Sequence, residues 1–182
     1  MVRVSGSGKE LKRICWLIVA GLLGACTPAP EFTDATGQSV SLRHFAGKPL
    51  LVNYFAPWCA PCLREMPRLN GLAAEGQITV VAINYDPTTP AELDKLAAQY
   101  HIKVPLLIAN EDARLPFPRP SGLPTSYLLD SEGKLKQTLV GELDQQQIEM
   151  LKATASSLSH SPIAAITVPH INATAINNNG AP

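Results

Sequence analysis

Two cysteines separated by two residues, Cys59 and Cys62, are the side chains best able to carry chemistry in this 182-residue sequence. They lie in the stretch FAPWCAPC (55–62), directly after an apolar run. Such a pair can bind a metal, stabilise a fold as a disulfide, anchor a haem or exchange electrons with other thiols.

Three of these four chemistries fit the surrounding sequence poorly. Haem attachment requires a histidine after the second cysteine, and Leu63 stands there. A disulfide that closes so short a loop adds little stability through loop entropy. A structural zinc site needs four ligands, whereas the histidines are scattered along the chain, at His44, His101, His160 and His170.

The position of the pair favours electron exchange. PLLVNYF (49–55) predicts a buried strand, and apolar residues at helical spacing follow from Leu63 onwards. The pair therefore falls where a strand ends and a helix begins, where free backbone N–H groups and the helix dipole stabilise a thiolate. We expect Cys59 to be the nucleophile and Cys62 to resolve the mixed disulfide. Trp58 is expected to cover one side of the site while leaving the sulfur accessible.

Two segments carry a resemblance to a known family. GKPLLVNYFAPWCAPCLREMPRL (47–69) resembles the active-site region of the thioredoxin superfamily, and within it the TlpA/ResA-like thiol–disulfide oxidoreductases. SGLPTSYLLDSEGKL (121–135) is similar to the cis-proline segment of that family. The resemblance spans residues 32–155 and implies an enzyme without a cofactor or bound metal.

The resemblance also implies roles for single residues. Pro124 would be cis and would place the Leu123 backbone beside the cysteines, where it pairs with an extended substrate segment. Trp58 and Thr125 would join Leu123 in contacting the substrate. Glu65 matches a glutamate near the active site of these proteins and would transfer protons during exchange; a solvated helix carboxylate is the alternative.

One residue departs from cytosolic thioredoxin. Asn53 stands where thioredoxin carries a buried Asp in the strand before its motif. An amide does not accept a proton at neutral pH as a carboxylate does, so proton transfer must go through Glu65 or water. Asn is also found in the TlpA/ResA group, so this residue indicates a subgroup of the superfamily.

The rest of the chain predicts alternating strands and helices. Two short extended pieces (32–42) surround a Thr36-Gly37 turn. Strands are expected at 49–55, 78–84, 104–109, 125–130 and 134–141, and helices from Leu63, at 90–100 and at 143–158. With the resemblance, this order predicts an α/β, thioredoxin-like fold: a central mixed sheet flanked by helices, with an N-terminal β-hairpin extension.

The N-terminal residues predict an export signal. A positive stretch with Lys9, Lys12 and Arg13 precedes an uncharged apolar run (14–25) that is too short to span a membrane. Its ending, LGAC, resembles a bacterial lipobox, in which Cys26 is lipidated; a secretory signal cleaved later and an uncleaved anchor are the alternatives. The expected organisation is a signal peptide (1–25), a lipidated tether (26–31), a thioredoxin-like domain (32–158) and a disordered tail (159–182).

This organisation places the domain in the bacterial envelope, facing the periplasm. Thr27 after the lipidated cysteine favours the outer membrane if the host has two membranes. Cys15 would be lost with the signal and Cys26 consumed by lipid, so only Cys59 and Cys62 remain for redox chemistry.

The expected partners follow from this location. They are protein dithiols and disulfides as substrates, a membrane electron donor of the DsbD type, and the lipid membrane itself. We expect a reductase, with apocytochrome c as one substrate candidate. Fifteen basic and fifteen acidic residues cancel, which argues against nucleic acid as a partner.

Two further functions are compatible with a cysteine on a thioredoxin-like fold. Peroxiredoxins share the fold but place Thr three residues before a lone cysteine; Ala56 occupies that position, so this activity is rejected. A Cu(I)-binding or metallochaperone module stays open, because two thiolates suit Cu(I), with His44 and His101 as candidate additional ligands.

Overall fold

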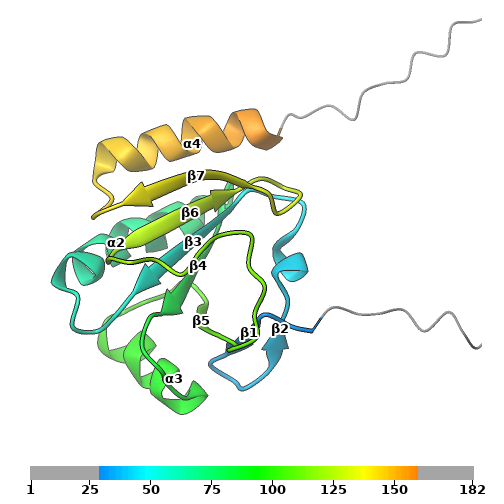
Figure 1. The fold of residues 1–182 in the computed structure, drawn as a ribbon. Coiled ribbons are helices and arrows are strands. Elements are labelled where there is room, and N and C mark those ends of the chain that lie inside the picture. Colours follow the sequence, from blue (N-terminus) through cyan, green and yellow to red (C-terminus); the bar gives the residue numbers. More distant parts are fainter. Residues whose placement is uncertain (1–28, 160–182) are drawn as a thin grey trace, which may run out of the picture.

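The computed structural model describes residues 29–159, which form a seven-stranded sheet flanked by helices (Figure 1). The strand order is β2-β1-β5-β4-β3-β6-β7, from bottom to top in Figure 1. The strands are β1 (Phe32–Asp34), β2 (Ser39–Val40), β3 (Leu50–Phe55), β4 (Thr79–Asn84), β5 (Leu106–Ala109), β6 (Thr125–Leu129) and β7 (Leu135–Val140). The helices are the 3-10 helix η1 (Leu42–Phe45), α2 (Ala60–Glu75), α3 (Pro90–Gln99) and α4 (Gln145–Ser159).

Three parallel strands form the centre of the sheet. β3 pairs with β4 along its whole length, and β4 pairs with β5 on its other side. Every residue of β3 and all but the first of β4 are buried. Parallel strands covered on both faces have continuous apolar runs, which explains why these two strands were recognisable in the sequence.

Both sides of this parallel centre are completed by antiparallel strands. β1 and β2 form a hairpin that turns at Gly37, where φ is 81°, and β1 extends the sheet beyond β5. On the opposite side β6 pairs antiparallel with β3, and β7 with β6. The predicted N-terminal hairpin and mixed sheet are confirmed. β5 begins two residues later than expected, after Pro105, which has no N–H for the ladder.

Side chains from α2, α3 and α4 belong to one apolar cluster on one face of the sheet. Leu69 and Leu72 come from α2, Leu93 from α3, and Ile148 and Leu151 from α4. The connections β3–α2–β4 and β4–α3–β5 advance across the sheet in the same direction, and right-handed crossovers then place both helices on the same face. α4 lies alongside β7 in Figure 1.

On the other face of the sheet, no α-helix of residues 29–159 contributes to the cover. Phe117 from the segment 110–124 packs against Tyr54 and Tyr127, and Phe45 of η1 packs against the same apolar cluster. The Phe117 ring stacks on the Tyr127 ring at a centroid distance of 4.6 Å. The segment 110–124 is therefore a structural cover as well as the connection that leads to β6.

Two details concern the predicted domain limits. Asn110 donates from its backbone to the Glu31 carbonyl and from its side chain to the Pro30 carbonyl, so contacts with the domain begin within the predicted tether. α4 continues to Ser159. No helix within residues 29–159 is long and apolar enough to cross a membrane; the predicted signal peptide and the tail beyond Ser159 lie outside the described residues.

Candidate active site

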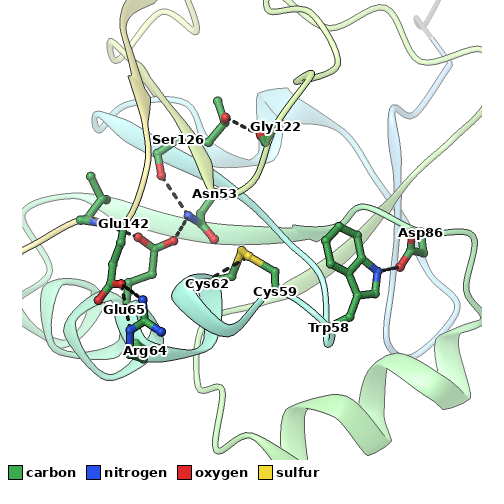
Figure 2. Close-up of a disulfide and its surroundings, with 12 residues drawn as sticks. Asn53, Trp58, Cys59, Cys62, Arg64, Glu65, Asp86, Gly122, Ser126 and Glu142 are labelled. Carbon is green, nitrogen blue, oxygen red and sulfur yellow. Dashed lines mark hydrogen bonds and ion pairs between the residues drawn. A yellow bond between two sulfur atoms is a disulfide. The ribbon is translucent and has the colours of Figure 1, made fainter.

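The two cysteines lie at the junction between β3 and α2, as predicted, and are joined in a disulfide (Figure 2). Cys59 is the N-cap of α2, and its sulfur accepts a hydrogen bond from the Cys62 backbone N–H at 3.3 Å. Pro61 occupies the first turn, where its missing N–H costs no helical hydrogen bond. In the reduced protein the same N–H donor and the helix dipole stabilise a thiolate at Cys59.

The two sulfurs differ in access. Cys59 retains 5% of its surface exposed, whereas Cys62, in the first turn of α2, is fully buried. A partner sulfur can reach only the Cys59 side of the disulfide. This difference supports the expected division between an attacking and a resolving cysteine.

Trp58 stands beside the pair and is 65% exposed. Its indole N–H donates to the Asp86 carboxylate at 2.6 Å (Figure 2). Asp86 belongs to the turn after β4, which is held by a bond from Asn84 Nδ2 to the Asp86 carbonyl and by one from the Tyr85 N–H to the Phe55 carbonyl. The tryptophan is thus fixed at the rim of the site with a large apolar surface in solvent.

Glu65 is completely buried, one turn after Cys62 in α2, so the solvated-carboxylate alternative is wrong. Its Oε1 accepts from Asn53 Nδ2 and its Oε2 from the Leu143 backbone N–H, both at 2.7 Å. Burial raises the pKa of Glu65 to about 7, against the opposing effect of these two donors. A carboxyl group with this pKa can gain or release a proton at neutral pH.

Asn53 of β3 connects Glu65 to the rest of the sheet. Its side-chain NH₂ also donates to Ser126 Oγ of β6 at 2.9 Å. Ser126 was not identified from the sequence, because only the pairing of β3 with β6 places its side chain against Asn53. The Asn53 Oδ1 atom is buried and has no hydrogen-bond partner among the described residues.

The Leu123-Pro124 peptide bond is cis, as the resemblance implied. The Pro124 carbonyl accepts from the Gly141 N–H, which ties this turn to the end of β7. Thr125 is buried, and its hydroxyl donates to the Gly122 carbonyl at 2.8 Å, so it stabilises the turn (Figure 2). Leu123 is half-buried, and the predicted substrate contacts of Leu123 and Thr125 stay predictions.

A cavity of about 690 Å³ lies next to the turn that carries Asp86. Its walls come from β3, from the end of β4 and the turn after it, from the end of β5 and from the segment 110–124; they include Tyr54, Asp86, Phe117 and Arg119. Arg119 also donates to the Tyr85 carbonyl and lies over the Tyr85 ring, 4.3 Å from its centroid. The segment 110–124 thus borders the turn that holds Trp58 through Asp86.

The candidate copper ligands lie in two separate elements. His44 is in η1 and His101 follows α3 with a positive φ of 53°. Within residues 29–159 no group of three or more His, Cys, Asp or Glu side chains is arranged to hold a metal ion. Cys15 and Cys26 lie outside the described residues.

Comparison with known proteins identifies the family. The Redoxin family model matches residues 25–154. The chain belongs to the Redoxin family. It is 34% identical over 126 residues to the thiol-disulfide oxidoreductase ResA of Bacillus thuringiensis subsp. konkukian, covering 66% of this chain and 72% of that protein. It is 32% identical over 127 residues to the thioredoxin-like protein YneN of Bacillus subtilis, covering 66% of this chain and 74% of that protein.

Solved structures agree with this assignment. A thioredoxin-family thiol:disulfide interchange protein from Chlorobium tepidum matches with a TM-score of 0.58 and 26% identity, over 71% of this chain and 95% of that one. A putative thioredoxin from Neisseria meningitidis matches with a TM-score of 0.60 and 26% identity, over 74% and 92%. The thioredoxin-like fold and the resemblance to ResA-like proteins are confirmed, and this Redoxin-family protein is a thiol–disulfide oxidoreductase that acts on protein dithiols or disulfides.

Proposed function

We propose that this oxidoreductase works as a reductase of protein disulfides, with Cys59 as nucleophile and Cys62 as resolving thiol. The observation that carries the assignment of the two cysteines is the asymmetry of the pair, and the reduction potential tests the direction of electron flow. Cys59 lies at the N-cap of α2 with its sulfur partly accessible, and Cys62 is buried. A thiolate is favoured at the accessible position, and the second thiol is protected until a mixed disulfide has formed.

The exchange proceeds in two steps. The Cys59 thiolate attacks one sulfur of the substrate disulfide, forms a bond to it, and releases the other sulfur as a thiolate that takes a proton from solvent. Cys62 then attacks the Cys59 sulfur, restores the Cys59–Cys62 disulfide and releases the first substrate sulfur. Two electrons pass to the substrate, so a dithiol donor must reduce the enzyme before the next cycle.

The remaining predicted site residues surround this reaction. Glu65 accepts the proton that Cys62 loses when it attacks; its burial one turn away and its raised pKa, about 7, support this role. The Leu123 backbone next to cis Pro124 pairs with an extended substrate segment, and Thr125 holds the turn. The exposed Trp58 surface contacts apolar substrate side chains.

We place the enzyme in the bacterial envelope, as a periplasm-facing lipoprotein anchored through Cys26 after removal of residues 1–25, in the outer membrane where the host has two. The lipobox-like sequence LGAC supports this location. A membrane donor of the DsbD type would then supply electrons. Apocytochrome c is one candidate substrate in that compartment.

Trapping of the mixed disulfide tests the proposed roles. In Cys62→Ser, the Cys59 thiolate attacks but the intermediate cannot be resolved, so we expect a covalent complex with a disulfide-containing protein substrate that dithiothreitol releases. Cys59→Ser is the matched control and should form none. An equal yield of complex from Cys59→Ser would overturn the assignment of the nucleophile.

A further inference from the structure

One polar atom in the active site is not accounted for by the roles above. The Asn53 side chain is fully buried, and its NH₂ group makes both of its hydrogen bonds, to Glu65 Oε1 and to Ser126 Oγ. Its Oδ1 atom has no partner among residues 29–159. A buried carbonyl oxygen without a donor is costly, so a donor is expected in some state of the enzyme.

The orientation of this amide is set by Glu65. Both carboxylate oxygens of Glu65 accept N–H groups, so Asn53 must present its NH₂ side to Glu65 and its oxygen to the opposite side. Ser126 does not determine the orientation, because a hydroxyl can donate or accept. Figure 2 shows the Asn53 oxygen pointing toward the Cys59–Cys62 disulfide.

Reduction of the disulfide supplies the missing donor. Side chains alternate along β3, and Asn53 lies on the face whose neighbours Leu51 and Phe55 share a cluster with Cys59 and Cys62. The disulfide offers no proton, whereas a Cys62 thiol carries one. Cys62 is fully buried, so solvent is not available to accept that S–H.

We propose that Asn53 is a positioning residue: its Oδ1 accepts the Cys62 S–H in the reduced enzyme, and the Glu65 carboxylate holds the amide in the orientation that makes this possible. The inference rests on the proposed role of Cys62 as the resolving thiol. In this arrangement the Cys62 proton is retained while Cys59, at the accessible position, attacks the substrate.

The same arrangement explains when Cys62 becomes free to attack the Cys59 sulfur. When the Cys62 proton passes to Glu65, the carboxyl group becomes a donor, and the Asn53 amide can rotate to present its oxygen to Glu65 and its NH₂ to the Cys62 thiolate. The thiolate then attacks the Cys59 sulfur, the Cys59–Cys62 bond forms, and the substrate sulfur leaves with the electron pair. Ser126 changes from acceptor to donor, so no hydrogen bond is lost.

The variants Glu65→Gln and Glu142→Gln together separate the effect of the Asn53 amide orientation from the effect of a nearby negative charge. The Leu143 N–H requires the carbonyl oxygen of the introduced glutamine, which leaves the glutamine NH₂ facing Asn53 and turns the Asn53 amide. Glu142→Gln is the matched control: the Glu142 carboxylate also acts on Glu65 electrostatically, as does the Arg68 guanidinium, but Glu142 has no bond to Asn53.

The readout is the infrared S–H stretching band of Cys62 in the full chain, with Cys15, Cys26 and Cys59 changed to Ala so that one thiol remains. At about pH 8, where Glu65 is ionised, we expect the band at the lower frequency of a hydrogen-bonded thiol. Glu65→Gln and Asn53→Ala should each move it to higher frequency, and Glu142→Gln should leave it in place. A band that Glu65→Gln or Asn53→Ala does not move overturns the proposal.

If the Asn53→Ala variant fails to fold, a second measurement on the unsubstituted protein tests the proposal. In the unsubstituted protein, the ¹³Cγ resonance of Asn53 should shift on reduction of the disulfide, because Oδ1 gains a donor; an unchanged resonance overturns the proposal. The mixed-disulfide trap with Cys62→Ser tests the proposed function separately. If Cys62→Ser forms the covalent complex but the S–H band does not move in Glu65→Gln or Asn53→Ala, the role of Asn53 is rejected and the proposed function is retained.

Discussion

At the scale of single residues, the active site depends on a buried polar chain rather than on the cysteines alone. The Asn53 NH₂ group donates to Glu65 and to Ser126, and the Leu143 backbone N–H donates to the other Glu65 carboxylate oxygen. Each of these groups would be costly to bury alone. Together they place an ionisable carboxyl group one helical turn from the resolving cysteine.

The burial of Glu65 predicts a pH-dependent stability. Its pKa is raised from 4.5 to about 7, so the folded protein binds this proton more tightly than the unfolded chain does. The resulting stabilisation is complete below pH 4.5 and is lost as the pH rises through about 7. We expect Glu65 to lower the free energy of unfolding of the oxidised protein by up to about 3 kcal/mol over this interval.

Urea denaturation at a series of pH values measures this effect. Glu65→Gln should abolish the contribution, so its unfolding free energy should vary less between mildly acidic and neutral pH. Glu142→Gln, which removes a carboxylate from a partly exposed ion pair with Arg64, should keep it. Identical pH profiles for the unsubstituted protein and Glu65→Gln would show that this carboxyl group titrates normally.

The sequence indicated part of this site. The cysteine spacing, the strand before it and the GLPT segment were sufficient to identify the dithiol and the cis-proline. The state of Glu65 was not predictable, because a glutamate at that helical position is either exposed or buried depending on distant partners. Asn53 is 12 residues away and Leu143 is 78 residues away, and only the folded sheet brings them together.

At the scale of elements, α2 and α4 act together to form the site. α2 carries Cys62 and Glu65 and has Cys59 as its N-cap, while the segment before α4 supplies the Leu143 N–H. Leu69 of α2 and Leu151 of α4 lie in the same buried cluster. The position of the N–H that binds Glu65 is therefore linked to how well α4 packs.

Two neighbouring residues of α4 test this packing. Leu151 is 1% exposed and Met150 is 52% exposed. We expect Leu151→Ala to reduce the free energy of unfolding by about 2–5 kcal/mol, because it removes buried methyl groups and leaves a cavity. Met150→Ala should change it by less than about 0.5 kcal/mol, measured by urea denaturation at one pH. An equal loss of stability in the two variants would contradict the assigned packing face of α4.

The elements differ in how far the sequence could predict them. The boundaries of β3, β4 and α4 were largely predictable, because these elements follow clear apolar patterns. Which strands are neighbours in the sheet was harder to predict. β6 lies beside β3, although α2, β4, α3 and β5 come between them along the chain. Such a pairing depends on contacts between distant segments, which local patterns do not encode.

At the scale of the whole molecule, the sheet gathers three separate segments around the disulfide. The β3–α2 junction supplies the cysteines, the turn after β4 holds Trp58 through Asp86, and the cis-proline turn precedes β6. The cavity beside Asp86 extends this surface toward the segment 110–124. A protein substrate would meet the accessible sulfur of Cys59 at the centre of these elements.

The reduction potential of the Cys59–Cys62 pair tests the central claim most directly. The full chain is equilibrated with thiol–disulfide buffers of known potential, and the reduced fraction is measured by thiol alkylation, with Cys59→Ser as the variant that cannot form the disulfide. A reductase is expected to show one two-electron transition near or below about −250 mV. A transition near about −120 mV would make the protein an oxidant, and a pair that failed to equilibrate with any buffer would contradict its role in thiol–disulfide exchange.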